Sequence, residues 1–157
     1  MSTSRIRSAT ADDRQAIAQL LGSLDLPTDD LDKLFDRDPS QFLVAEDMSE
    51  SASLSGVVGI EECCEHALLR SVAVRPDMQQ QGLGHRLVEH AVAQAEARGV
   101  AALYLLTMTA ELYFPRFGFE RVARDVVPSD IATTAEFTHA CPASAVVMRR
   151  SITTPLA

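Results

Sequence analysis

The chain has 157 residues, of which 46% are hydrophobic and 23% are charged, so it has the size and composition of a globular domain. This composition excludes a disordered chain, and the apolar runs are far shorter than the roughly 20 residues of a membrane span. The net charge of −8, with Lys33 as the single lysine, excludes the basic surfaces that bind nucleic acids or anionic lipids.

In chain order, residues 4–8 form a first expected strand. Thr10, with Asp13 three positions later, has the pattern of a helix capping box, and a second helix is expected from about Thr28. The polar segment 48–53 is expected to be mobile. Three further strands are expected in this half of the chain, at residues 42–45, 56–63 and 67–74.

The clearest helix covers residues 83–98, where a stripe of apolar side chains leads to Gly99, a residue type that favours a left-handed helix end. The elements expected after it are a strand at 101–107, a short helix at 110–116, a strand at 119–124, a helix at 128–140 and a strand at 144–152. This order predicts a mixed α/β fold around one sheet, with residues 1–157 as a single domain.

A glycine-bearing loop joins the strand at 67–74 to the long helix. Gly82 and Gly84 allow a close approach of the backbone to a ligand, and the unpaired amides of a first helical turn attract phosphate groups. Arg75 and Arg86 flank the loop and add local positive charge. The pattern predicts a pyrophosphate site, whereas glycines that serve only the turn are the alternative explanation.

Two common nucleotide motifs do not match this loop. A P-loop requires Gly-Lys-Ser/Thr, but His85 and Arg86 follow Gly84, and a Rossmann fingerprint requires a third glycine. The loop instead resembles the coenzyme A loop of the GNAT family of N-acetyltransferases. Gln79, Gly82 and Gly84 match the family pattern Gln/Arg-x-x-Gly-x-Gly/Ala.

A second motif strengthens this resemblance, because residues 113–119 are similar to the family signature Tyr-x-x-x-x-Gly-Phe. The resemblance covers roughly residues 4–124. It implies the GNAT fold, a mixed central sheet with splayed parallel strands flanked by helices, with acetyl-CoA as cosubstrate. The cofactor-binding residues that it implies are Val72, Ala73, Val74, Gln79, Gln80, Gln81, Gly82, Leu83, Gly84, His85, Arg86 and Thr107.

The resemblance also implies catalytic roles. Tyr113 would protonate the departing CoA thiolate, its alternative role being that of a core tyrosine. Several relatives carry a glutamate eleven residues before the motif's glutamine, where this chain has Leu68. Glu62, or its neighbour Glu61, is the expected replacement as the base that takes the amine proton. The alternative for both is a solvated hairpin end.

The C-terminal third resembles N-acetyltransferases found with arsenic-resistance genes, which acetylate the α-amine of arsinothricin, a glutamate analogue. Close neighbours of these enzymes act on phosphinothricin. The similar segments are residues 67–74, 127–131, 136–137 and 141–148.

A doubly anionic substrate of this kind needs forked cationic donors, so Arg70 and Arg75 are the predicted substrate-binding residues. The alternatives are a salt-bridged Arg70 and an Arg75 that binds CoA phosphate. At the level of the whole protein, a biosynthetic glutamate N-acetyltransferase and a non-catalytic acyl-CoA sensor are the alternatives.

No metal site is expected, because adjacent strand residues such as Cys63 and Cys64 point to opposite faces and the four histidines lack ligand spacing. The odd number of cysteines, namely Cys63, Cys64 and Cys141, and the absence of an apolar signal core predict reduced thiols in a cytoplasmic protein. The expected partners are a small anionic amine and a second copy of the chain, which would pair through an edge strand at 144–152.

Overall fold

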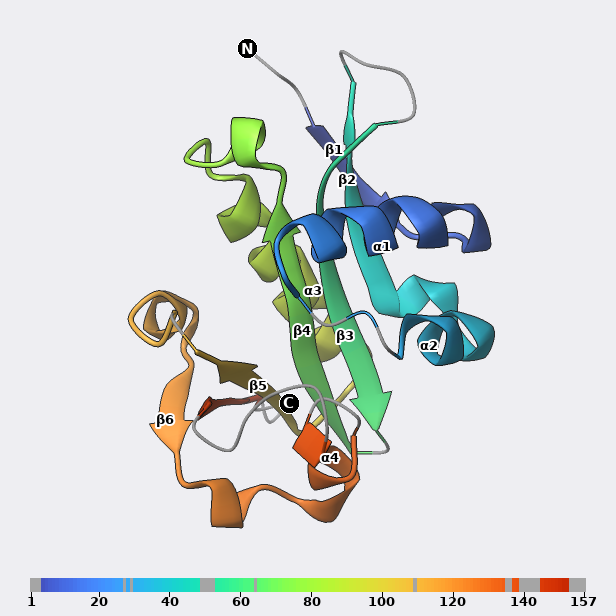
Figure 1. Ribbon diagram of the computed structural model, residues 1–157. Coiled ribbons are helices and arrows are strands. Elements are labelled where there is room, and N and C mark those ends of the chain that lie inside the picture. Colours follow the sequence, from blue (N-terminus) through green and yellow to red (C-terminus); the bar gives the residue numbers. More distant parts are fainter. Residues whose placement is uncertain are drawn as a thin grey trace.

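The computed structural model describes residues 4–26, 28, 30–48, 53–63, 65–108, 110–134, 137–138 and 145–152. They form a seven-stranded sheet with the order β1-β2-β3-β4-β5-β7-β6 (Figure 1), which confirms the predicted α/β fold around one sheet. Strands β4 and β5 pair in parallel, and the other neighbours pair antiparallel. The strands are β1 (Ser4–Ser8), β2 (Phe42–Asp47), β3 (Leu54–Cys63), β4 (His66–Val74), β5 (Ala102–Thr107), β6 (Glu120–Val122) and β7 (Val146–Ser151).

Helices cover both faces of this sheet (Figure 1). One face of the sheet packs against α3. The opposite face packs against α1 and α2 over one part of the sheet and against α4 over another. Gly56 of β3 lets α3 come close, because a Cβ there would lie 2.8 Å from Leu87 Cδ1. The α-helices are α1 (Arg14–Ser23), α2 (Leu31–Arg37), α3 (Leu83–Ala97) and α4 (Ser129–Ala132).

Strands β4 and β5 separate soon after they pair. Their parallel register joins three residue pairs, of which the last is Leu68 with Tyr104. Beyond this point β4 continues beside β3 to Val74, whereas β5 continues beside β7 to Thr107. The two strands diverge toward the end of the molecule that carries the glycine loop (Figure 1). This divergence is the splay that the resemblance implied, and it leaves one edge of β4 open to a ligand.

A β-bulge bends β4 within the splayed part. The register between β3 and β4 shifts between Val57 and Gly59, so that two β4 residues, Ser71 and Val72, together oppose one β3 residue. Ser71 has a φ of +58°, a left-handed conformation that costs a non-glycine residue about 1–2 kcal/mol. The surrounding sheet therefore holds Ser71 in a conformation that the residue would not adopt by itself.

The helix expected at 128–140 is interrupted in the structure, where α4 ends at Ala132 and a π-helical turn includes residues 137–138. The reason lies in two threonines that bond to nearby backbone carbonyls, since Thr133 Oγ1 donates to Ser129 O at 2.9 Å and Thr134 Oγ1 donates to Ile131 O at 2.7 Å. Similarly, the short helix expected at 110–116 is a 3₁₀ turn over Phe114–Phe117, which ends as predicted at Gly118.

The strand expected at 144–152 is not an edge strand. As β7, it lies between β5 and β6, although β6 pairs with only three of its residues, Val147–Arg149. The prediction of an edge strand is therefore wrong, whereas pairing with a second copy of the chain stays a prediction. Of the segment expected to be mobile, residues 49–52 lie outside the described residues.

Candidate functional site

The predicted pyrophosphate loop lies where β4 ends and α3 begins. Gln79 Nε2 donates to the Val74 carbonyl at 2.9 Å and so ties the loop to the end of the strand. Gln80 and Gly82 both have left-handed backbones, with φ values of +66° and +81°. These two residues turn the chain so that α3 begins at Leu83 with its first amides directed out of the helix.

The space beside the loop is open. A Cβ added to Gly82 would meet nothing within 4 Å, whereas one added to Gly84 would lie 3.6 Å from Val74 Cγ2 and 3.7 Å from Tyr113 Oη. The two family-like motifs, which are far apart in the sequence, therefore converge at Gly84. The exposed loop, the helix start and the splayed strand form a cradle of the kind that a CoA pyrophosphate and its attached arm require.

We expect Gly82→Val to lower the affinity for acetyl-CoA at least tenfold, about 1.4 kcal/mol, because its side chain would occupy the space beside the helix amides. Calorimetric titration measures this. Gly99→Val is the matched control, since Gly99 also has a positive φ, +74°, and open space around its Cβ. The control should have the same backbone strain but keep its affinity for acetyl-CoA. An equal loss of affinity in both variants would contradict the predicted role of the loop.

Tyr113 lies in an aromatic group next to this cradle. Its ring contacts Phe114 and Phe117 edge-on, and the guanidinium of Arg116 lies 4.4 Å from the ring centroid. Burial raises the pKa of Tyr113 above its ordinary value, although the charge of Arg116 acts in the opposite direction. The phenol therefore stays protonated at neutral pH and has a hydrogen bond to donate.

Three other residues predicted to bind the cofactor contact neighbouring parts of the protein through their side chains. Thr107 Oγ1 accepts a hydrogen bond from the Ala110 amide at 3.0 Å and thereby stabilises the turn after β5. The His85 ring lies 4.7 Å from that of Phe117, and its Nε2 is 3.3 Å from the Glu89 carboxylate. Arg86 donates to the carbonyl of Ser4 at 3.3 Å, on the first strand of the sheet.

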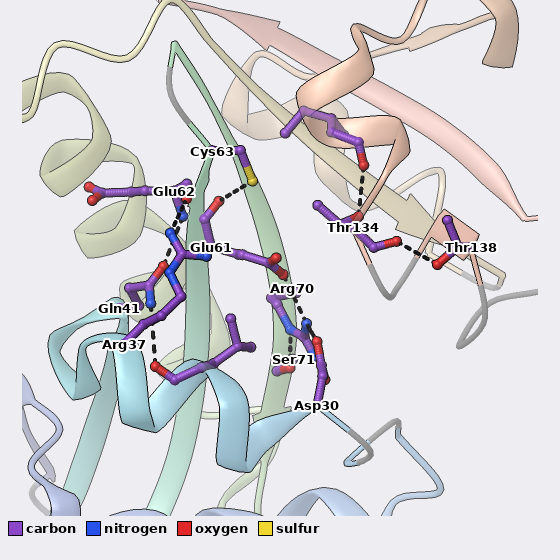
Figure 2. A network of polar contacts seen from close by, with 12 residues as sticks. Asp30, Arg37, Gln41, Glu61, Glu62, Cys63, Arg70, Ser71, Thr134 and Thr138 are labelled. Atoms are coloured by element: carbon purple, nitrogen blue, oxygen red, sulfur yellow. Dashed lines mark hydrogen bonds and ion pairs between the residues drawn. The ribbon is translucent and has the colours of Figure 1, made fainter.

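Arg70 lies at the centre of a buried polar network (Figure 2). Its guanidinium binds both carboxylate oxygens of Asp30, at 2.5 and 2.8 Å, and one oxygen of Glu61, at 3.1 Å. Its Nε donates to the hydroxyl of Ser71 in the bulge at 3.2 Å. Gly59 makes room for the arginine, because a Cβ there would lie 3.1 Å from Arg70 Cγ.

Arg75 is paired as well, at the other end of β4. It binds the carboxylates of Asp47 and Asp77 at 2.9 and 2.6 Å, and hydrogen bonds to these carboxylates raise its pKa above the ordinary value. Its remaining contact is with the hydroxyl of Ser53. Arg70 and Arg75 were predicted to present their charges to a substrate, but in the structure both charges are already balanced by aspartates.

Glu61 and Glu62, the two predicted replacements for the missing base, point to opposite faces of β3. Glu62 forms an ion pair with Arg98 at the end of α3, at 2.8 Å. Glu61 lies on the face of α2, directly across the strand pair from Leu68, the position at which relatives carry their glutamate. Of the two predicted residues, Glu61 is therefore the one that lies beside the position of the relatives' glutamate.

A pocket of about 370 Å³ lies beside this network, between α2, β3 and the end of α4. An adjoining pocket of about 390 Å³ shares four of its residues, namely Arg37, Glu61, Thr133 and Thr134. Figure 2 shows Arg37, Glu61 and Thr134, which come from segments far apart in the sequence. The residues that line the first pocket are Asp30, Lys33, Leu34, Arg37, Glu61, Thr133 and Thr134.

The sequence analysis missed most of these residues. Asp30, Lys33 and Arg37 have a recognisable signal, because polar residues spaced three and four apart lie on one side of a helix. Thr133 and Thr134 have none, since they were expected inside a longer helix.

Within the described ranges, no three His, Cys, Asp or Glu side chains are grouped as metal ligands would be. Cys63 donates through Sγ to the Glu61 carbonyl at 3.6 Å, while Cys64 and Cys141 lie outside the described residues. None of the helices in the described part of the chain combines the length and the hydrophobicity that crossing a membrane requires.

Comparison with known proteins agrees with this geometry. The amino-acid acetyltransferase of Ralstonia nicotianae is 30% identical over 132 residues, which are 80% of this chain and 28% of that protein. The ribosomal protein bS18 alanine N-acetyltransferase of Escherichia coli is 36% identical over 58 residues, which are 37% of this chain and 39% of that protein. The matched part of the chain thus spans only 28% and 39% of the length of these two curated relatives.

Among solved structures, N-acetylglutamate synthase from Neisseria gonorrhoeae, complexed with coenzyme A and N-acetyl-glutamate, superposes with a TM-score of 0.79. Its sequence identity is 20%, and the superposition covers 98% of this chain and 36% of that chain, so this likeness concerns the fold. A family model of the acetyltransferase (GNAT) domain matches residues 38–121. The protein therefore belongs to the GNAT acetyltransferase family.

Proposed function

We propose that the protein transfers the acetyl group of acetyl-CoA to the α-amine of a small amino acid with an anionic side chain. The observation that carries the proposal is the opening between β4 and β5. The glycine loop and Tyr113 lie at its wide end, and the charged pocket with Glu61 lies near the point where the strands meet. Donor and acceptor would therefore approach the same stretch of β4 from two sides.

The reaction requires a neutral amine and a leaving thiolate. The ammonium group of the acceptor gives a proton to Glu61, directly or through a water molecule, and the neutral nitrogen then attacks the thioester carbonyl carbon. As the carbon–sulfur bond breaks, the surplus proton that the nitrogen now carries passes to the departing thiolate. The products are the N-acetylated amino acid and CoA. Backbone amides at the bulged, open edge of β4 are the groups that would stabilise the negative charge on the carbonyl oxygen.

Tyr113 would stabilise the thiolate as it leaves. A thiol has a pKa of about 8.5 and a tyrosine one of about 10, which burial raises further for Tyr113. For a thiol of ordinary pKa, full proton transfer from this phenol is uphill. We therefore propose that Tyr113 acts mainly through a hydrogen bond to the sulfur, with protonation of the thiolate, the role that the resemblance implies, as the alternative.

We expect Tyr113→Phe to lower kcat about ten- to a hundredfold and to leave the KM for acetyl-CoA nearly unchanged. A hydrogen bond to a charged group contributes about 1.5–3 kcal/mol, and this bond forms fully only as the thiolate develops. Steady-state kinetics measure the change, with Tyr104→Phe, the chain's other tyrosine, as the control. A full-rate Tyr113→Phe enzyme would remove Tyr113 from the mechanism, and a loss of 10³–10⁴ would indicate general acid catalysis instead.

Arsinothricin is the acceptor that we propose first and phosphinothricin the second, because residues 67–74, 127–131, 136–137 and 141–148 resemble the enzymes that acetylate arsinothricin. Glutamate is the alternative, which the match to an amino-acid acetyltransferase favours. The test is thiol release from acetyl-CoA with arsinothricin, phosphinothricin, glutamate and neutral amino acids. Faster turnover of glutamate than of arsinothricin would favour biosynthesis over detoxification. No release with any amine would favour a sensor that only binds acyl-CoA.

A further inference from the structure

One side of α2 forms a wall of the charged pocket. Asp30, Lys33 and Arg37 follow one another at spacings of three and four residues, and all three line the pocket. The opposite side of the same helix, with Leu31 and Phe35, is buried in the core. The hydrophobic packing of α2 thus fixes which of its charges face the pocket.

The charged residues that line this pocket, counted together with the buried Arg70 beside it, are positive in balance, on a protein whose net charge is −8. Asp30 and Glu61 both pair with Arg70, so two carboxylates face one guanidinium. Lys33 and Arg37 add two cations. No carboxylate in the described part of the chain forms an ion pair with either of them, and Arg37 donates only to the carbonyl of Glu62, at 3.0 Å.

The acidic residues of the adjoining pocket lie away from the α2 wall. Glu62 pairs with Arg98 at 2.8 Å, and the carboxylate of Asp130, on α4, lies 2.9 Å from His66 Nδ1. The cations that lack a carboxylate partner in the described part of the chain therefore lie together on the α2 wall, where they attract an anion.

We infer that Arg37 and Lys33 bind the anionic side-chain head of the acceptor and so select acidic over neutral amino acids. This inference rests on the proposed function, in which the amine of the same acceptor is directed toward Glu61. A guanidinium and an ammonium group suit a carboxylate as well as a tetrahedral oxyanion. Arg70 and Arg75, the residues predicted from the sequence, are already ion-paired with aspartates, so we assign this role to Lys33 and Arg37 instead.

Glutamate and glutamine test the inference, because they are almost equal in size and differ in charge. We expect Arg37→Gln to lower kcat/KM for glutamate about ten- to a hundredfold and that for glutamine less than about threefold. Lys33→Gln should act in the same direction. Arg14→Gln is the control, since Arg14 pairs with Asp32 of α2 outside the pocket. This variant should leave kcat/KM unchanged for both glutamate and glutamine.

Equal losses for the two substrates, or no loss, would overturn the inference while leaving the proposed function intact. If the wild-type protein acetylates no amine at all, the proposed function fails instead. Calorimetry with phosphinothricin and CoA-saturated protein separates the two cases. If phosphinothricin binds, and if Arg37→Gln weakens this binding while Arg14→Gln preserves it, the inference is supported even when no amine is acetylated. Absence of binding to the wild-type protein would overturn the inference.

Discussion

Replacing Glu61 by glutamine should lower kcat by about 10²–10⁴-fold, the usual contribution of a general base. The glutamine keeps the size of the side chain and an oxygen that can accept from Arg70, so the network around it should persist. The measurement is the rate of thiol release at saturating acetyl-CoA and acceptor. The deficit should shrink as the pH rises, because a growing fraction of the acceptor amine is then neutral without help from the enzyme.

This pH dependence separates a base from a residue that only supports the structure. A merely structural loss would stay constant as the amine loses its proton in solution. Glu46→Gln serves as the control, since Glu46 is also ion-paired, with Arg7, and lies on β2 away from the pocket. A large loss in Glu62→Gln together with a full rate in Glu61→Gln would return the role to Glu62, as the sequence first indicated.

Removing Arg70 should produce the largest loss of stability. The side chain is 1% exposed, and Arg70→Ala would leave the carboxylates of Asp30 and Glu61, which are 12% and 9% exposed, without their cation. Breaking a buried ion pair in this way costs about 3–5 kcal/mol, and in a domain of this size it lowers Tm by on the order of 10 °C. Thermal unfolding monitored by circular dichroism measures the change.

The matched comparison is Arg14→Ala. Arg14 also pairs with an aspartate, Asp32, but the two side chains are 51% and 78% exposed, so its removal should cost less than about 1 kcal/mol. A second variant, Arg70→Lys, keeps the positive charge but loses the planar guanidinium that binds both oxygens of Asp30. Its stability should lie between those of Arg70→Ala and the wild type. An Arg70→Ala protein with an unchanged Tm and a reduced acceptor kcat/KM would show that Arg70 binds substrate, contrary to the pairing described above.

Much of the donor half of the site could be predicted from the sequence because its determinants are local. The period of apolar residues in α3 specifies a buried stripe, and the left-handed backbones at Gly82 and Gly118 occur where the sequence provides glycine. Tyr113 and the coenzyme A loop are each defined by a few neighbouring residues. Their convergence at Gly84 needed only one intervening helix and one strand.

The acceptor half depends on contacts that are remote in the sequence. Arg70 pairs with Asp30, forty residues earlier, and the pocket brings α2 together with threonines that follow α4. Alternation along a strand predicts that Glu61 and Glu62 point to opposite faces. It does not indicate which face meets the acceptor, because that depends on which helices cover each side of the sheet.

The sequence by itself therefore determined the α/β class, the family and the donor loop, since short-range periodicity and backbone conformation need only neighbouring residues. Tertiary structure alone decided that Arg70 and Arg75 are neutralised, that Lys33 and Arg37 line the pocket and that β7 lies inside the sheet. The physical reason is that a charge becomes available or paired according to the residues that folding places beside it. A strand likewise becomes an edge or an interior strand according to the neighbours with which it pairs.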